Sequence, residues 1–266
     1  MSAVTGPAAP RAAVELRPRA VVAIAITSLA GVFAFLWPLF VSPDSALAHS
    51  GDAPLVFAAI LVGVLAVVLA EVGEGGLDTK AVAMLGVLSA VGAALRPLGA
   101  GTAGLETVFF LLILAGRVFG PGFGFVLGAT TLAASAMITA GVGPWLPFQM
   151  LAAAWVGLGA GLLPRARGRA EVLMLCGYGV LTGLLYGAAL NFSFWPFTIQ
   201  GEESLAFVAG APVADNLTRF LAFTLATSLG WDLVRALTNA VLIAITGRPV
   251  LASLRRAARR ASFAPR

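Results

Sequence analysis

The feature that most constrains this sequence is a stretch of 47 residues, 118–164, that contains no Asp, Glu, Lys or Arg. A helix crosses the bilayer core, about 30 Å thick, with about 20 apolar residues, so this stretch is long enough for two crossings. Hydrophobic residues make up 59% of the chain and charged residues 11%, too few to cover a water-facing surface, since soluble domains have about 25%. Apolar runs in lipid form helices because their backbone groups must bond internally. The sequence therefore predicts an all-α integral membrane protein.

Eight apolar segments, separated by charged or Gly- and Pro-rich breaks, are expected to form the helices of the membrane bundle. In chain order they cover residues 20–41, 54–70, 80–95, 105–116, 123–140, 147–163, 172–190 and 216–246. The fourth is the shortest and is expected to be tilted, re-entrant or extended past Arg117. The first is too long for a typical signal-peptide core, so we expect a retained helix. Residues 191–215 are expected to form a long connection.

The distribution of charge predicts the orientation of the chain in the cell (cytoplasmic) membrane. Lys and Arg in short loops mark the cytoplasmic side. With an even number of spans, Lys80, Arg117, the basic turn at 164–169 and both arginine-bearing termini face the cytoplasm. The outer side then receives Asp44, His49, Asp52, Glu202, Glu203 and Asp215, together with Arg96 and Arg219. The net charge of +5 has the same origin, so membrane lipid rather than nucleic acid is the expected partner.

Small residues recur every four positions on four of the expected helices, which is the spacing that allows helices to approach closely in lipid. The four stripes are Gly86, Ala90 and Ala94; Gly120, Gly124 and Gly128; Ala153, Gly157 and Gly161; and Gly179, Gly183 and Gly187. Packing inside the bundle is the simpler interpretation of each stripe. A face of this kind can equally receive a helix from another subunit.

Catalytic and metal-binding patterns are not found in the sequence. Cys176 is the only cysteine and His49 the only histidine, so neither a disulfide, a thiolate metal site nor a recognisable nucleophile–base pair is expected. A phosphate-binding Gly-rich loop with lysine is also lacking, so ATP is not expected to bind by that route. We therefore expect no catalytic residue, no metal and no cofactor.

Polar residues at membrane depth are the better candidates for function, because they are costly there. Asp232 and Arg235 lie three residues apart in the last segment, either as a self-compensated structural pair or in a substrate or coupling role. Rings and amides also gather on the expected outer side, as in an interfacial aromatic belt or a pocket for a flat polar metabolite. The candidate substrate-binding residues are Arg96, Glu106, Trp145, Gln149, Asn191, Trp195, Asn216 and Arg219.

From about Lys80 onward, the chain resembles the substrate-binding S components of energy-coupling factor (ECF) type vitamin transporters. The resemblance rests on AVAMLGVLSAVGAALRP at 81–97, the segment 106–119, the FGPGFG turn at 119–124 and the closing LASLRR at 251–256. It covers roughly the last two thirds of the chain. The departure from the family is the region before Lys80, which contains about two extra helices.

This resemblance implies a six-helix core at 80–250, preceded by a cytoplasmic tail at 1–19 and an extra helical pair at 20–79, and followed by a basic tail at 251–266. It implies a binding subunit and not an enzyme. A vitamin-like micronutrient would be captured outside and released inside, when the subunit is coupled to a transmembrane T component and two ATP-binding subunits. Ala90 and Ala94 match the family's docking pattern, with Gly86 one turn earlier, and residues 97–104 match the connection that covers the substrate.

Two other classes of function remain open. A self-sufficient secondary transporter of a small metabolite often has charges near the membrane midplane, as Asp232 and Arg235 would provide. A membrane enzyme would need convergent acids, a metal cluster or a nucleophile–base pair. Glu71, Glu74 and Asp78 lie near one another but have no histidine among them.

Overall fold

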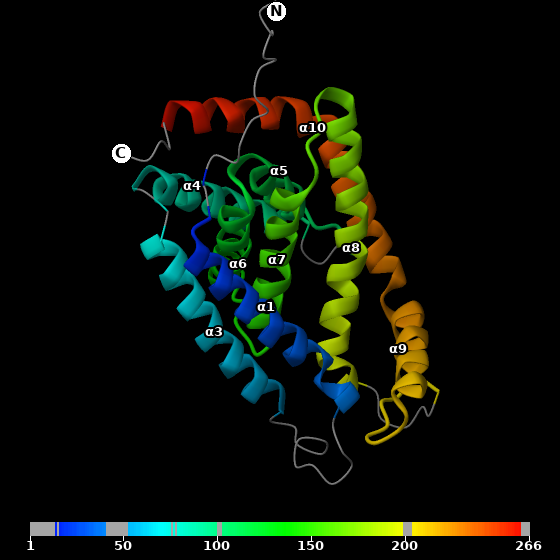
Figure 1. The fold of residues 1–266 in the computed structure, drawn as a ribbon. Helices are drawn as coiled ribbons and strands as arrows, with labels where there is room; N and C mark the ends of the chain where they lie inside the picture. The colour runs from blue at the N-terminus through cyan, green and yellow to red at the C-terminus, as the bar shows by residue number, and fades with distance from the viewer. Residues whose placement is uncertain are drawn as a thin grey trace, which may run out of the picture.

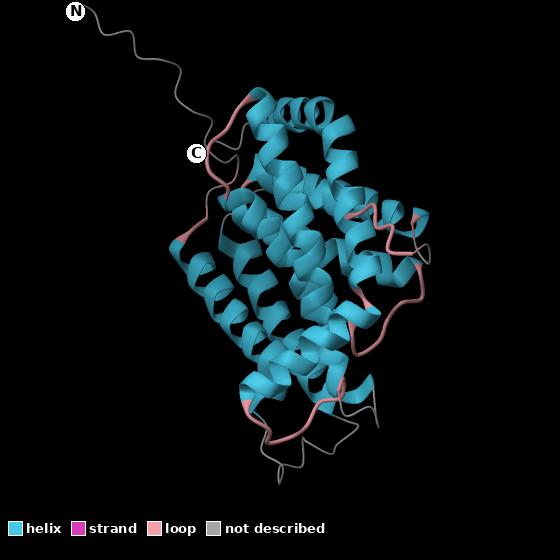
Figure 2. Cartoon of the chain, turned by 90° about the vertical axis from the view of Figure 1, so that its right-hand side faces the viewer, coloured by secondary structure: helices cyan, strands magenta, loops and turns pink. Residues whose placement is uncertain are grey.

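The computed structural model describes residues 14, 16–40, 53–75, 77, 79–99, 103–198 and 204–261, and within them the chain consists of helices and connecting loops (Figure 2). Five residues that were predicted for the outer side lie outside this part: Asp44, His49, Asp52, Glu202 and Glu203. The elements are α1 (Pro18–Leu36), η1 (Trp37–Phe40), α3 (Ala53–Gly75), α4 (Thr79–Leu95), η2 (Arg96–Leu98), α5 (Phe109–Phe119), α6 (Pro121–Ile138), α7 (Leu146–Leu162), α8 (Gly168–Thr198), α9 (Val213–Thr227) and α10 (Leu229–Ala261).

Six helical segments in the described residues are long and apolar enough to cross a membrane. They cover Pro18–Phe40, Ala53–Ala70, Thr79–Leu98, Pro121–Ile138, Gly168–Phe197 and Leu229–Arg260. Two shorter apolar helices, α5 and α7, complete the bundle. The expected all-α fold is confirmed, and these helices indicate a multi-pass membrane protein.

The helices pack around a central pair formed by α6 and α7 (Figure 1). α1 and α3 lie side by side along one flank, where α3 contacts α7 and α1 contacts α8. α8 and α10 pair on the other flank, and α4 packs on α6. Buried side chains from 20–72 and from 88–254 belong to one hydrophobic core. The N-terminal helices α1 and α3 are thus packed continuously onto the rest of the bundle.

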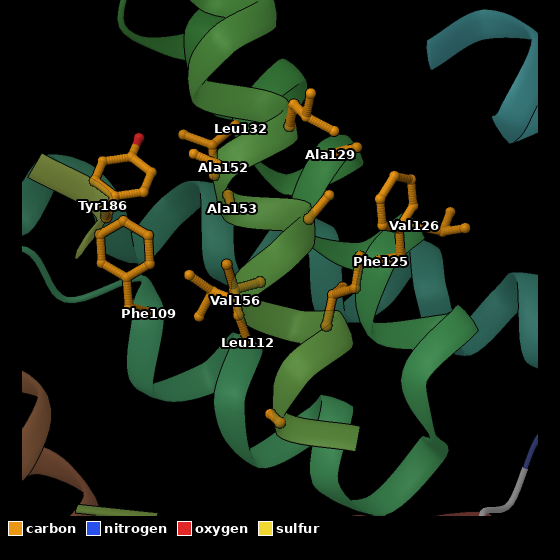
Figure 3. Close-up of a cluster of buried hydrophobic side chains, with 14 of the residues drawn as sticks. Phe109, Leu112, Phe125, Val126, Ala129, Leu132, Ala152, Ala153, Val156 and Tyr186 are labelled. Carbon is orange, nitrogen blue, oxygen red and sulfur yellow. The ribbon is translucent and has the colours of Figure 1, made fainter. Parts of the chain in front are cut away.

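Glycines allow α6 and α7 to come into backbone contact. A Cβ atom at Gly124 would overlap the carbonyl oxygen of Gly157, and one at Gly128 would overlap that of Ala153. Apolar side chains such as Phe125, Leu132 and Val156 fill the space around this contact (Figure 3). The stripes expected on the fifth and sixth segments are therefore internal packing faces, as small residues in membrane helices usually are.

The small-residue stripe of α8 has a more specific partner. A Cβ at Gly183 would approach the Cα of Ala236 to 2.8 Å, and a Cβ at Gly187 would overlap the carboxylate of Asp232. This stripe therefore lets α10 lie against α8 and also leaves room for the charged side chains of α10.

The stripe of α4 behaves differently. Gly86, Ala90 and Ala94 are all exposed, and a Cβ at Gly86 would have nothing within 4 Å. The buried residues lie on the opposite side of α4, which faces α6. There the hydroxyl of Ser89 is hydrogen-bonded to that of Thr130 at 2.7 Å. Of the four stripes, this one is unused by the packing of the described chain.

Several boundaries of the predicted segments were wrong, and the last helix, for example, continues to Ala261 instead of ending at residue 246. The seventh helix does not end at residue 190, because α8 continues to Thr198 and includes Asn191 and Phe194. The last segment is not one helix, because Ser228 separates α9 from α10. Tertiary packing explains the longer α8. The rings of Phe192 and Trp195 pack on Phe220 of α9, and these contacts stabilise the additional helical turns.

The short fourth segment forms α5, only 11 residues long, which reaches about 16 Å at the helical rise and so spans about half of a bilayer core. It is enclosed by α6, α7 and α10, and Leu112, Ile113 and Leu114 are fully buried. It extends past Arg117 to Phe119, where Gly120 with φ of 106° turns the chain into Pro121 at the start of α6. Glycine tolerates that backbone conformation.

One buried carboxylate joins three helices at the end of the bundle where α8 begins. Glu171 of α8 accepts from Arg117 Nε of α5 at 2.9 Å and from Arg255 Nη2 of α10 at 2.6 Å. The last part of α10 lies across this end of the bundle (Figure 1), and Pro249 lies inside this helix. The change of direction is expected at a proline inside a helix.

Candidate functional site

A cavity of about 300 Å³ opens at the opposite end of the bundle, where α6 turns into α7 and where α8 ends. Its lining consists of Trp145, Gln149, Leu190, Asn191, Phe194 and Phe223. Trp145 and Gln149 come from the start of α7, the next three from the last turns of α8, and Phe223 from α9. The lining contains rings and amides but no charged side chain.

The two amide side chains of the cavity are held by neighbouring groups. Asn191 Nδ2 donates to Ser228 Oγ at 2.7 Å, at the break between α9 and α10. Gln149 Oε1 accepts from Arg96 Nη2 at 3.1 Å. Trp145 lies one turn before Gln149, and its ring nitrogen donates to the carbonyl oxygen of Gly141 at 3.2 Å. Hydrogen bonds of this kind orient polar groups before a ligand arrives.

A chain of aromatic contacts supports the cavity from the side of α1. The ring of Phe194 lies edge-on to that of Phe148, with centroids 6.0 Å apart, and Phe148 lies edge-on to Phe35 of α1 at 5.1 Å. Phe148 is 1% exposed. α1 therefore backs one wall of the cavity through the buried ring of Phe148.

A network of charged side chains lies between α8, α10 and the segment before α5. Arg235 of α10 donates to Asp232 Oδ1 at 2.5 Å, to Glu106 Oε1 at 3.2 Å and to the carbonyl oxygen of Gly183 at 3.2 Å. The guanidinium group also lies over the ring of Tyr186, 5.4 Å from its centroid. Asp232 and Arg235 are 4% and 7% exposed. Two carboxylates thus share one buried cation.

Trp195 and Asn216 hold the segment between α8 and α9. Trp195 is fully buried, and its Nε1 donates to the carbonyl oxygen of Leu205 at 2.7 Å. Asn216 exchanges two hydrogen bonds with the backbone of Val208, at 3.2 and 2.8 Å. Both residues bond to the described part of this connection, at Leu205 and Val208, and neither lines the cavity.

The eight candidate residues therefore separate into groups. Trp145, Gln149 and Asn191 come together in the cavity, and Arg96 bonds to one of them. Glu106 belongs to the charged network. Trp195, Asn216 and Arg219 lie outside the cavity lining, and Arg219 Nη1 is buried without a hydrogen-bond partner among the described residues.

Sequence reasoning missed Phe223 and Leu190 as cavity residues and Tyr186 as a partner of the charged network. A sequence signal was present for Phe223, because Asn216, Phe220 and Phe223 recur at the spacing of one helical face. No comparable signal identified Tyr186.

Among the described residues, no group of three His, Cys, Asp or Glu side chains is placed to hold a metal ion. Cys176 donates to the carbonyl oxygen of Ala240 at 3.5 Å between α8 and α10, where it acts as a packing residue.

Comparison with protein families, with curated proteins and with solved structures finds no match to this chain.

Proposed function

We propose that this chain is the substrate-binding subunit of an ECF-type importer, which captures a vitamin-like micronutrient outside and releases it inside when coupled to a T component and two ATP-binding subunits. The observation that carries the proposal is the cavity at the end of the bundle, in which Trp145, Gln149 and Asn191 meet. The resemblance of residues 80–266 to S components supports the same conclusion.

The lining of the cavity indicates the chemistry of the ligand. Trp145 and Phe194 offer ring faces for stacking, while Gln149 and Asn191 offer donors and acceptors for a polar edge. With no charge in the lining, a net ionic group on the ligand would be poorly compensated there. A volume of about 300 Å³ suits one small flat ring system, at the lower end of small-molecule sites.

The docking face of the proposed subunit is the exposed side of α4. Gly86, Ala90 and Ala94 offer a smooth surface on which a helix of the T component can lie closely. ATP hydrolysis belongs to the partners in this arrangement, and the two extra helices, α1 and α3, lie on a different flank of the bundle.

The first experiment is purification in mild detergent from the native membrane, followed by mass spectrometry of bound proteins and released small molecules. We expect a T component and ATP-binding subunits together with a flat, uncharged, vitamin-like compound. The double variant Ala90→Trp, Ala94→Trp should lose the protein partners and keep the compound. Ile245→Trp is the matched control, because Ile245 is 71% exposed on α10.

A chain that purifies alone and empty, yet transports solute in liposomes, would contradict the proposal. The alternative function, a self-sufficient secondary transporter, is favoured by one observation, the buried network of Asp232, Arg235 and Glu106. Charges near the midplane are the coupling sites of many such transporters. Proton-dependent uptake by the purified chain, lost in Asp232→Asn and Glu106→Gln, is the result that would support it.

A further inference from the structure

A second hollow lies on the outer flank of the bundle, between α1 and α3. It has a volume of about 540 Å³ and shares no lining residue with the amide-lined cavity. Val22 and Ile26 of α1 form one wall, and Val64 and Val67 of α3 form the other. Val22, Ile26 and Val67 are each more than half exposed. The α1–α3 groove is therefore an open apolar channel on a surface that faces lipid.

Apart from Arg19 at one end, the lining of the α1–α3 groove has no polar side chain that lacks a partner. Its one hydroxyl, that of Thr27, donates to the carbonyl oxygen of Ala23 at 2.8 Å. A hydrocarbon chain therefore fits the groove without leaving a buried donor or acceptor unpaired. Lipid tails are as apolar as these walls, so a fit of shape alone gives no preference for one lipid over another.

The preference comes from the cation at one end. Arg19, in the first turn of α1, lines the groove and is exposed, and it forms no ion pair with any side chain that the structure describes. This end of α1 points toward the end of the bundle across which the last part of α10 lies (Figure 1). A free guanidinium at the mouth of an apolar channel is complementary to a phosphate joined to acyl chains.

We propose that the α1–α3 groove binds one anionic phospholipid, with an acyl chain along Val22, Ile26 and Val67 and with its phosphate group at Arg19. The site does not depend on the transport function. It gives the extra N-terminal pair a role of its own, as the part of the chain that recognises the lipid.

The test uses the full chain in bilayer nanodiscs that contain equal amounts of phosphatidylglycerol and phosphatidylcholine. The protein is then transferred to mild detergent, and native mass spectrometry counts the lipids that remain bound. We expect the wild-type chain to retain phosphatidylglycerol over phosphatidylcholine by about fivefold, the scale expected for one arginine near a headgroup. Arg19→Gln should abolish this preference. Val67→Trp should fill the groove and release lipid of both kinds.

Two controls separate this site from the general lipid layer. Arg259→Gln removes an exposed arginine from the end of α10, and Val62→Trp adds the same bulk to α3 outside the groove lining. Both should keep the wild-type lipid count and preference. The proposal is overturned if Arg19→Gln behaves like Arg259→Gln, if Val67→Trp retains as much lipid as Val62→Trp, or if the groove is covered by a second copy of the chain, seen as a lipid-free dimer.

Discussion

Asn191 is the side chain that connects the cavity with the break in the last membrane segment. Its amide donates to Ser228 between α9 and α10, while it also lines the cavity. Gln149 is placed similarly, because its amide oxygen accepts a hydrogen bond from Arg96 and its side chain lines the same cavity. Substitution of Asn191 or Gln149 is expected to lower the ligand affinity without disrupting the fold. Asn216 differs, because its amide bonds only to the backbone.

We predict that Asn191→Ala and Gln149→Ala each weaken ligand binding by about tenfold, the effect of one lost hydrogen bond of about 1.4 kcal/mol. Isothermal titration with the compound identified by mass spectrometry measures this. Asn216→Ala is the comparison: we expect a lower melting temperature in detergent and little change in affinity for the protein that remains folded. Equal affinity losses at Asn191 and Asn216 would exclude the cavity as the binding site.

The charged network leads to a prediction about stability. Arg235→Leu leaves the carboxylates of Asp232 and Glu106 without their shared cation, so we expect a loss of about 3 kcal/mol. Asp232→Leu should cost less, because Arg235 keeps Glu106 as its partner. The double variant Asp232→Leu, Arg235→Leu should recover part of the loss from Arg235→Leu. Unfolding in detergent measures all three.

The same variants distinguish a structural role from a coupling role. A double variant that recovers stability and still takes up substrate would assign the network to structure. Recovered stability together with abolished uptake would assign it to transport.

At the scale of the element, the four small-residue stripes look alike in sequence but have different partners. Gly157 faces the backbone of Gly124 on α6, whereas Gly86 faces open space. We predict that Gly157→Leu destabilises the chain by about 3 kcal/mol or more, because the new side chain would collide with the backbone of α6, which cannot move aside as a flexible side chain could. Gly86→Leu should leave the melting temperature unchanged while lowering the yield of co-purified partners. A stability loss at Gly86 as large as that at Gly157 would contradict the exposed face of α4.

The elements also show which boundaries can be read from sequence. α4, α6 and α7 begin and end within two residues of the predictions, because charged residues or Gly and Pro clusters mark their ends. The end of α8 could not be predicted in this way. Asn191 and Phe194 share one face of the extended helix and line the cavity, while Trp195, one residue on, faces α9. This difference of about 100° around the helix is invisible while the segment is taken for a loop.

At the scale of the whole molecule, the orientation predicted from Lys and Arg can be tested by chemical labelling. Cys176 is the only cysteine, so Cys176→Ser provides a background for labelling with membrane-impermeant maleimide in intact cells. We expect Val142→Cys, at the turn between α6 and α7, to be labelled from outside. Arg167→Cys and Arg259→Cys should be labelled only after the cells are opened. The reverse pattern would invert the orientation and place the amide-lined cavity on the cytoplasmic side.

The sequence by itself determined that the chain is a helical membrane protein, because the scarcity of charge leaves lipid as the only solvent for most of its surface. It also determined which residue types gather near each end of the bundle. Only the tertiary structure decided which of them meet. Residues as far apart as Gln149 and Phe223 line one cavity, and Glu106 reaches Arg235, because helix packing brings distant turns together. A helical period fixes the face of a side chain, whereas the neighbour on that face depends on every other helix in the bundle.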